Sequence, residues 1–369
     1  PYDFPVVGYN GKSVNYLRLF SAKTDDELDL NIFNNGGYIE AVRDKIRTET
    51  ISKVLYPSDN IEQGKELRLT QQYFFVSCAI QDIIRRFMEK SNDFKKMPDY
   101  VCIQLNDTHP ALAIVEMMRQ LMDVYGQEWD DSWEIVTKIF AYTNHTLLPE
   151  ALEKWSSSII RRFLPRHLQI IYEINRRFME FARSRFGEDS YKLGKVSIVD
   201  GEGDNQVIRM ANLSIVGSFS INGVAKLHSE LVKHSLVPEF YELWPEKFTN
   251  VTNGVTPRRW MLRANHDLAN LISDKIGTSW ITNLDELQNI EKYSEDKSFL
   301  KEFLKIKNEN KQRLAQKVYR ATRIMVDPNS MYIVHAKRIH EYKRQLMTVL
   351  QIIGDYLAIT RDNVRPITP

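Results

Sequence analysis

The chain of 369 residues carries 50 Lys and Arg against 48 Asp and Glu, so it has no basic excess for a nucleic-acid backbone and we expect no nucleic-acid partner. No run reaches the roughly 18–20 apolar residues of a membrane span, so we expect no membrane partner. Cys78 and Cys102 form neither a zinc pattern nor a disulfide framework. We therefore expect no metal and a reducing, cytoplasmic location. The length suits two domains of roughly 100–200 residues each, and Pro1 in place of Met suggests a piece of a longer protein.

Apolar periodicity predicts an α/β fold in the first part of the chain. Two long helices come first, and two short apolar runs then each lead through a polar loop into a helical pattern. Such loops carry function in many α/β proteins, so the loops 106–110 and 144–146 are candidate site segments. In chain order the predicted elements are a helix at 37–55, a helix at about 66–92, a strand at 101–105, a helix to about 124, a strand at 139–143, and helices at 148–155 and 166–186.

Turn residues interrupt this pattern around Asn253 and Pro257, which predicts a domain boundary. We therefore expect one domain at 1–253 and a second at 254–369. Helical patterns resume after the boundary and continue to about 320. The apolar run at 331–336 then predicts a buried strand that leads into a helix.

Cations cluster where this strand would meet the helix, at Lys337, Arg338, Lys343 and Arg344. The N-terminal amides and the dipole of a helix favour anions, and Arg adds a bidentate fork that Lys supplements as a point charge. The segment is therefore a candidate phosphate site. A solvated basic helix face explains the same charges.

Several single residues admit two interpretations each. Asp107 and His109 fit acid/base or metal chemistry, but an Asx-turn or a helix N-cap explains them equally well. His145 is either a donor that faces a ligand or a half-buried histidine. Trp260 and Tyr342 are either site residues or core aromatics.

Two further features favour structural interpretations. Gly201-Glu-Gly203 opens like a dinucleotide-binding fingerprint, but Gln206 stands in the place of its third glycine, so we expect a hairpin or loop. Arg85 and Arg86, near the end of a predicted helix, are more typical of surface charge than of an effector site.

Four motifs in fixed order carry more information than any single residue: Gln104-Leu-Asn-Asp-Thr-His-Pro110, Ala141-Tyr-Thr-Asn-His-Thr146, Asn253-Gly-Val-Thr-Pro-Arg-Arg-Trp260 and Lys337-Arg-Ile-His-Glu-Tyr-Lys-Arg-Gln345. From Pro5 to about Gln351 the chain closely resembles the glycogen (α-1,4-glucan) phosphorylase family. The resemblance implies two Rossmann-like α/β domains facing each other across a cleft, the GT-B-type glycosyltransferase architecture, both incomplete in this chain. Residues 1–253 would be the C-terminal part of the glucan- and glucose-binding domain, and 254–369 the start of the cofactor- and phosphate-binding domain.

The resemblance also implies roles for individual residues on the sugar side. Asp59 would lie in a loop that gates the cleft. The helix at 37–55 would be a tower-like helix that packs against a second subunit, so a homodimer is expected. The residues that bind the sugar would be Asp107, His145, Asn253 and Tyr342.

On the phosphate side, Arg338 and Lys343 match the site of the substrate phosphate and, with His145, would be the catalytic residues. Lys337 and Trp260 match positions that hold pyridoxal 5′-phosphate. The lysine that binds the aldehyde of this cofactor in the family lies in a downstream segment that the chain does not reach, so no Schiff-base lysine is assigned.

The reaction that the resemblance implies is reversible phosphorolysis. Inorganic phosphate attacks the non-reducing end of an α-1,4-glucan such as glycogen and releases glucose 1-phosphate with retention of configuration. Without the lysine segment, the chain alone would be inactive. Phe219 departs from the family pattern, which has His there, and so removes a polar group.

Two other classes of function remain open. A nucleotide-sugar glycosyltransferase of the same fold would also need Lys and Arg at a helix N-terminus, to bind a diphosphate. A non-catalytic glucan-binding piece would fit an incomplete chain.

Overall fold

The computed structural model describes residues 1–364, apart from the side chains of Asp204 and Tyr342. The chain consists of two compact units, and the second unit begins at Gly254. The strands of the first unit are β1 (Tyr2–Val7), β2 (Val14–Leu19), β3 (Ile103–Asn106), β4 (Phe140–Thr143), β5 (Lys154–Ser156), β6 (Val199–Asp200), β7 (Val207–Arg209), β8 (Ser220–Gly223) and β9 (Phe248–Asn250). Its α-helices are α1 (Leu30–Asn34), α2 (Arg43–Thr50), α3 (Glu62–Met88), α4 (Met97–Tyr100), α5 (Leu112–Arg119), α6 (Trp129–Ile139), α7 (Ser157–Phe163), α8 (Pro165–Phe186), α9 (Ser190–Val196), α10 (Met210–Gly217), α11 (Lys226–Leu231) and α12 (Pro238–Leu243).

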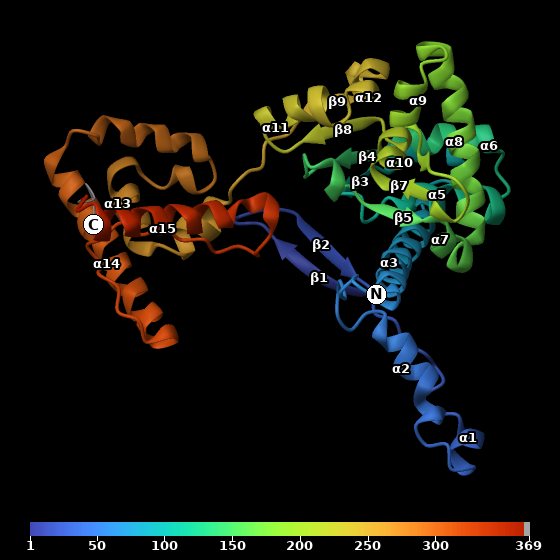
Figure 1. Ribbon diagram of the computed structural model, residues 1–369, viewed down its shortest axis with the longest axis horizontal. Helices are drawn as coiled ribbons and strands as arrows, with labels where there is room; N and C mark the ends of the chain where they lie inside the picture. Colours follow the sequence, from blue (N-terminus) through green and yellow to red (C-terminus); the bar gives the residue numbers. More distant parts are fainter. Residues whose placement is uncertain (365–369) are drawn as a thin grey trace. The chain divides into compact units, whose positions relative to one another are not determined.

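A four-stranded parallel sheet in the order β3-β4-β8-β9 lies at the centre of the first unit (Figure 1). Buried strands of parallel sheets are continuous apolar runs, and Phe140, Ala141 and Tyr142 of β4 are all buried. The register places Gln104 beside Ala141, and Tyr142 beside Ile221. Because all four strands run in one direction, their carboxyl ends meet at one edge of the sheet.

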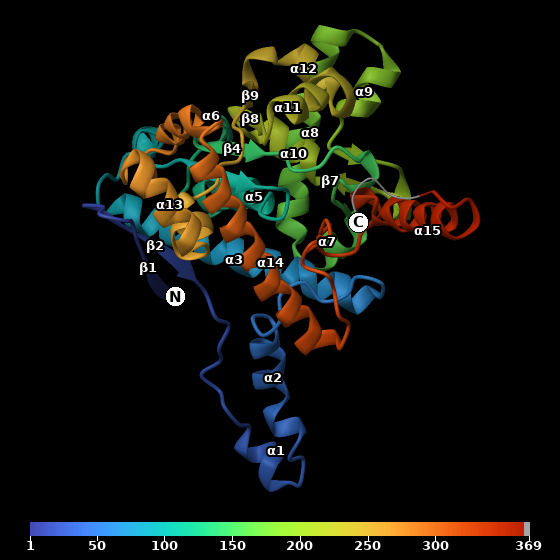
Figure 2. The same ribbon diagram turned by 90° about the vertical axis from the view of Figure 1, so that its left-hand side faces the viewer.

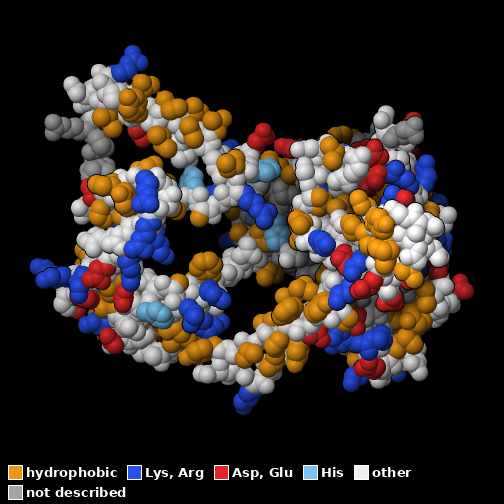
Figure 3. Space-filling view, turned by 90° about the horizontal axis from the view of Figure 1, so that it is seen from below, with side chains coloured by type: hydrophobic (Ala, Val, Ile, Leu, Met, Phe, Trp, Pro, Cys, Tyr) orange, Lys and Arg blue, Asp and Glu red, His pale blue; other side chains and the backbone are white. Residues whose placement is uncertain are grey.

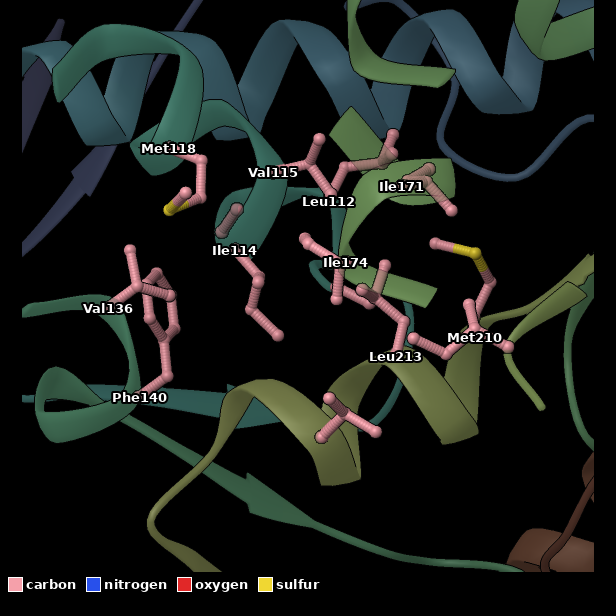
Figure 4. Packing of buried hydrophobic residues seen from close by; sticks show 14 of the residues in the cluster. Leu112, Ile114, Val115, Met118, Val136, Phe140, Ile171, Ile174, Met210 and Leu213 are labelled. Carbon is pink, nitrogen blue, oxygen red and sulfur yellow. The ribbon is translucent and has the colours of Figure 1, made fainter. Parts of the chain in front are cut away.

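Helix α5 runs through the hydrophobic core of this unit. Leu112, Ile114 and Val115 have no exposed surface. Figure 4 shows them in the same packed interior as Ile174 of α8 and Leu213 of α10. Burial of one such side chain contributes about 1.5–3 kcal/mol, so this core holds the sheet and the loops at its edge in place.

A second, antiparallel sheet has the order β5-β7-β6. Strands β6 and β7 pair across the loop that contains Gly201 and Gly203, which confirms the predicted hairpin. Gly201 has a φ of +80°, a conformation that favours glycine. The predicted helix at 148–155 is wrong, because only a 3₁₀ turn at Pro149–Ala151 forms before β5 pairs with β7.

The segment with α1 and α2 projects from the rest of the first unit in both ribbon views (Figures 1 and 2). The helix predicted at 37–55 is shorter than expected, because a 3₁₀ turn at Glu40–Val42 leads into α2, which ends at Thr50. No residue of α2 is buried. Short helices without packing partners are marginal in water, which explains why the helix does not continue.

The second unit is helical in its described part, with α13 (His266–Ile276), α14 (Lys297–Thr322) and α15 (Gln345–Arg361). Its small hydrophobic core consists of Ala269, Ile272, Trp280 and Ile281.

The predicted buried strand at 331–336 is wrong. This segment has no regular structure, and Met331, Ile333 and Val334 are between 63% and 71% exposed. A strand of a parallel sheet needs a neighbour to take its backbone hydrogen bonds, and the described part of the second unit contains no strand. A Rossmann-like sheet is therefore not observed there.

The surface carries mixed charge. On the face in Figure 3, Lys and Arg side chains are interspersed with Asp and Glu side chains. Arg85 pairs with Asp82 (2.9 Å) and Glu89 (2.7 Å) on its own helix, so it belongs to a solvated helix surface as predicted. Within residues 1–364, none of the helices has the length and apolar character that crossing a membrane requires.

Candidate active site

Polar residues gather at the carboxyl edge of the parallel sheet, where β3, β4 and β8 end. This edge is the usual ligand position in open α/β sheets. The Nε2 atom of His145 lies 2.6 Å from Oδ1 of Asn106, and this bond joins the loop after β4 to the last residue of β3. One strand further, Thr143 Oγ1 donates to Asn222 Oδ1 over 2.8 Å. The His145 side chain is exposed, so the alternative of a half-buried histidine does not hold.

Asp107 follows β3 directly and has a left-handed backbone, with φ of +66°. This conformation is costly for a residue with a side chain, and such strain concentrates at functional sites. The Asp107 amide donates to the carbonyl of Thr143 (3.2 Å), and its carboxylate accepts from the Thr108 amide (2.6 Å). The carboxylate thus takes part in a local turn while remaining partly exposed at the edge.

The structure adds His228, which we did not select as a site residue from the sequence. Its Nδ1 accepts a hydrogen bond from the Val224 amide (3.1 Å), so the proton of the neutral ring is on Nε2. That Nε2 atom is buried and has no partner among the described residues. Burial lowers the pKa of His228, and the charge of His145 lowers it further, so the ring stays neutral as a donor.

Gly223, at the end of β8, allows His228 to approach. A Cβ atom at this position would lie 2.7 Å from Nδ1 of His228 and 2.4 Å from Oγ of Ser229. The Asn253 amide donates to the carbonyl of Val224 (3.0 Å), so the exposed Asn253 lies beside the same edge.

The loop of Asp59 is held by helix α3. Gln71 donates from Nε2 to the carbonyl of Val54 (2.7 Å) and accepts from the amide of Tyr56 (3.3 Å). One turn earlier, Arg68 forms an ion pair with Asp59 (3.0 Å). The loop is thus fixed at three points by side chains on one face of the helix.

The same loop reaches the sheet edge through ring contacts. The Tyr56 ring lies 5.4 Å from the His109 ring and 5.2 Å from the Arg68 guanidinium. Next to this contact is a cavity of about 530 Å³ whose walls are mostly apolar. Its polar lining includes Arg68, Gln71, Asn106 and His109.

We expect Gln71→Ala to loosen the Asp59 loop. The variant removes the acceptor of the Tyr56 amide and the donor to Val54, so local opening becomes easier by about 1–3 kcal/mol. Hydrogen exchange at the Tyr56 amide should accelerate roughly tenfold or more. The control is Gln81→Ala, which removes only an exposed bond to Ser77 on the same helix. Equal exchange in both variants would show that Gln71 does not hold the loop.

The predicted phosphate segment lies in the second unit as an exposed loop before α15. Lys337 and Arg338 are exposed, and Lys343 is half-buried in a 3₁₀ turn. Gln345 fixes this loop, because its Nε2 donates to the carbonyl of Arg338 (3.1 Å) and its Oε1 accepts from the amide of His340 (3.0 Å). The cations therefore lie close to the N-terminus of α15, although the segment directly before them, 331–336, does not form the predicted strand.

Trp260 and Tyr342 are the two remaining predicted site residues of the second unit. Trp260 is 65% exposed in a π-helical turn at Arg258–Arg263, so it is not a core aromatic. The side chain of Tyr342 lies outside the described part of the structure. Among the described residues, no cluster of His, Cys, Asp and Glu could hold a metal ion.

Comparison with known proteins adds a second line of argument. The sequence profile of one family, carbohydrate phosphorylase, matches residues 1–369. The chain belongs to the carbohydrate phosphorylase family. Glycogen phosphorylase of Synechocystis sp. is 49% identical over the whole chain, which covers 43% of that protein. The brain form of glycogen phosphorylase from Rattus norvegicus is 48% identical over the whole chain and 45% of its own length, and glycogen phosphorylase 2 of Dictyostelium discoideum is 50% identical over 97% of the chain and 36% of its own length.

This phosphorylase-family chain thus spans less than half the length of these relatives. Its mixed α/β structure with a parallel sheet is consistent with the family.

Proposed function

We propose that the protein to which this chain belongs is an α-1,4-glucan phosphorylase. The observation that carries the proposal is the 49% identity to a glycogen phosphorylase over all 369 residues. The substrates would be a glycogen-type glucan and inorganic phosphate, and the product glucose 1-phosphate.

The sheet edge of the first unit would bind the terminal glucose. Asp107 would accept hydrogen bonds from sugar hydroxyls, and His145 and Asn253 would supply further polar contacts. Asp59, on the loop held by Gln71, would cover the bound sugar. The proposal is supported by the bond between His145 and Asn106 and by the strained backbone of Asp107, which keep both loops in one arrangement.

The cationic loop of the second unit would bind phosphate. Arg338 and Lys343 would hold the attacking phosphate, and fixed positive charge would stabilise the negative charge that develops as the glycosidic bond breaks. With Tyr342, which we propose as a sugar contact, these residues form one short segment of the chain.

The charge of Lys337 and the ring of Trp260 support a role for these residues in binding the phosphate end of pyridoxal 5′-phosphate. Lys337 and Trp260 would hold the group, since Lys337 is an exposed cation in the loop before α15 and Trp260 offers an exposed ring. When bound, the group would supply a second phosphate in addition to that of the substrate. Two neighbouring dianions repel strongly at reduced dielectric, and such repulsion would account for several cations within seven residues. No residue is assigned to the aldehyde.

We further propose a homodimer in the cytoplasm, in which the projecting segment with α2 contacts a second subunit. Residues 1–253 would serve as part of the glucan-binding domain, and residues 254–369 as the start of the cofactor- and phosphate-binding domain. The exposed surface of α2, which has no buried residue, supports a role in contact with a partner.

The test is phosphorolysis by the full-length protein. Glycogen with inorganic phosphate should yield glucose 1-phosphate, and a nucleotide sugar should give no transfer to glycogen. Transfer from the nucleotide sugar without phosphorolysis would establish a glycosyltransferase instead. Binding of glycogen without either reaction would establish a non-catalytic glucan-binding protein.

A further inference from the structure

A second cavity of about 220 Å³ lies away from the sheet edge, among α6, α8 and the 3₁₀ turn Pro245–Lys247 before β9. Its walls are aromatic. Its aromatic lining includes Trp129, Trp133, Trp244 and Phe181, and its polar lining includes Thr137, Arg177 and Lys247.

The rings are packed in a fixed arrangement. Trp244 stacks on Phe181 with ring centroids 5.4 Å apart and an interplanar angle of 6°. The Arg177 guanidinium lies 5.0 Å from the centroid of the Trp129 ring. Such preformed aromatic walls suit a flat ring of a ligand.

Two hydrogen-bond donors of this cavity, on Lys247 and Trp129, have no acceptor among the described residues. The Lys247 amine lies 3.9 Å from the centroid of Trp244, and no acceptor among the described residues pairs with it. The indole N–H of Trp129 is buried and also has no partner within the described chain. The Lys247 amine is only partly buried, so an acceptor that enters the cavity from outside the chain can reach it and supply the partner that it lacks.

The lining contains no carboxylate, and the Thr137 hydroxyl already donates to the carbonyl of Trp133 (2.9 Å). A neutral sugar would bring several hydroxyl hydrogens that need acceptors, and the side chains of this cavity offer only the Thr137 hydroxyl oxygen. An anion with a ring is a better match, because it brings acceptors only. Arg177 is less available than Lys247, since Asp130 (2.5 Å) and Glu173 (2.7 Å) already pair with it.

We propose that this cavity binds a small cyclic acid, an aromatic or heterocyclic carboxylate whose ring lies against the tryptophans and whose carboxylate meets the amine of Lys247. The site is separate from the residues of the proposed phosphorolysis and does not depend on that proposal.

Binding should depend on pH in a defined direction. Burial lowers the pKa of Lys247 to about 8, and the neighbouring charge of Glu246 opposes this shift only in part. The charged guanidinium of Arg177 keeps its charge at all relevant pH values. Affinity for a carboxylate should therefore be constant from about pH 5, where the ligand is ionised, to about pH 7, and fall as the pH rises through about 8 and the Lys247 amine loses its proton.

The experiment titrates the full chain with benzoate and follows tryptophan fluorescence, since three of the six tryptophans line the cavity. For a ligand of this size, saturable quenching in the millimolar range or tighter is expected. Benzyl alcohol, which has the ring but no charge, and acetate, which has the charge but no ring, should each bind at least about tenfold more weakly.

Variants of Lys247 decide the assignment. Lys247→Met keeps the side-chain length and should weaken benzoate binding about tenfold or more. Lys247→Arg should retain binding above pH 8, where the native chain loses it. Lys275→Met is the matched control, because Lys275 also stacks on an aromatic ring, that of Tyr293, outside the cavity.

Unchanged affinity in Lys247→Met, equal binding of benzyl alcohol and benzoate, or no saturable quenching would each overturn the proposal. Circular dichroism of each variant checks that the fold is kept. Failure of this test would leave phosphorolysis by the full-length protein unaffected, so the two proposals fail separately.

Discussion

In the full-length protein, Lys343→Ala should lower kcat/KM for inorganic phosphate by more than about 10²-fold, the scale on which loss of a preorganised charge contact acts. Lys343 is half-buried, whereas Lys337 and Arg338 of the same loop are exposed. A charge in a partly desolvated position interacts more strongly with phosphate than one in water. Steady-state kinetics with varied phosphate at saturating glycogen would measure the effect.

The control is Lys305→Ala on α14, which removes only an exposed ion pair with Glu302 (3.2 Å). Its kinetics should match those of the native protein, because exposed pairs contribute little. If Lys343→Ala also turns over at a near-normal rate, the assignment of Lys343 to the phosphate site is wrong.

Glu116→Gln should lower the free energy of unfolding by about 3–5 kcal/mol, the usual cost of removing one partner of a buried charge pair. Glu116 is fully buried on α5, where Arg119 donates to it through Nε (2.9 Å) and Nη2 (2.8 Å). Gln120 (2.9 Å) and His167 of α8 (2.7 Å) complete its contacts. Neutralising Glu116 leaves Arg119 without its buried counter-charge, in the packed contact between α5 and α8. Urea unfolding monitored by circular dichroism measures the loss.

The same carboxylate makes the free energy of unfolding depend on pH in the acidic range. Burial alone would raise the pKa of Glu116, but the hydrogen bonds from Arg119, His167 and Gln120 hold it at about 2. A carboxyl with a lowered pKa in the folded state stabilises the fold above its ordinary pKa near 4.5, and this stabilisation is lost as pH falls toward about 2. The gap in stability between the native chain and Glu116→Gln should therefore shrink from pH 5 to pH 2.

Glu134→Gln serves as the control for this pair of measurements. Glu134 is exposed on α6 and pairs only with Lys138 (2.6 Å), so its loss should cost no more than about 0.5 kcal/mol. A gap between the native chain and Glu116→Gln that stays constant with pH would show that the titration of Glu116 does not contribute to stability.

Sequence periodicity predicted the elements that bury one apolar face. Strands β3 and β4 and the helices α3 and α8 lie within a few residues of their predicted ranges, because their apolar residues pack into one core. The prediction failed where a partner decides the structure. Strand β5 forms because β7 lies beside it, and the run at 331–336 stays irregular because no strand is present to pair with it in the described part of the second unit.

The candidate site could be proposed from sequence motifs, but the contacts within it could not be predicted from them. Asp107 and His145 were assigned to the site through the family resemblance, and the parallel order of the sheet brings both to one edge. The unpaired Nε2 of His228 and the hydrogen bonds between Gln71 and the Asp59 loop depend on the packing of residues far apart in sequence. Periodicity carries no information about such contacts.

The most direct test of the account is glucose 1-phosphate formation by the full-length protein from glycogen and phosphate, measured before and after pyridoxal 5′-phosphate is removed. We predict that activity is lost on removal and returns when the cofactor is added back. Undiminished phosphorolysis without the cofactor, or in a variant in which Lys337, Arg338 and Lys343 are all neutral, would contradict the proposed role of these cations.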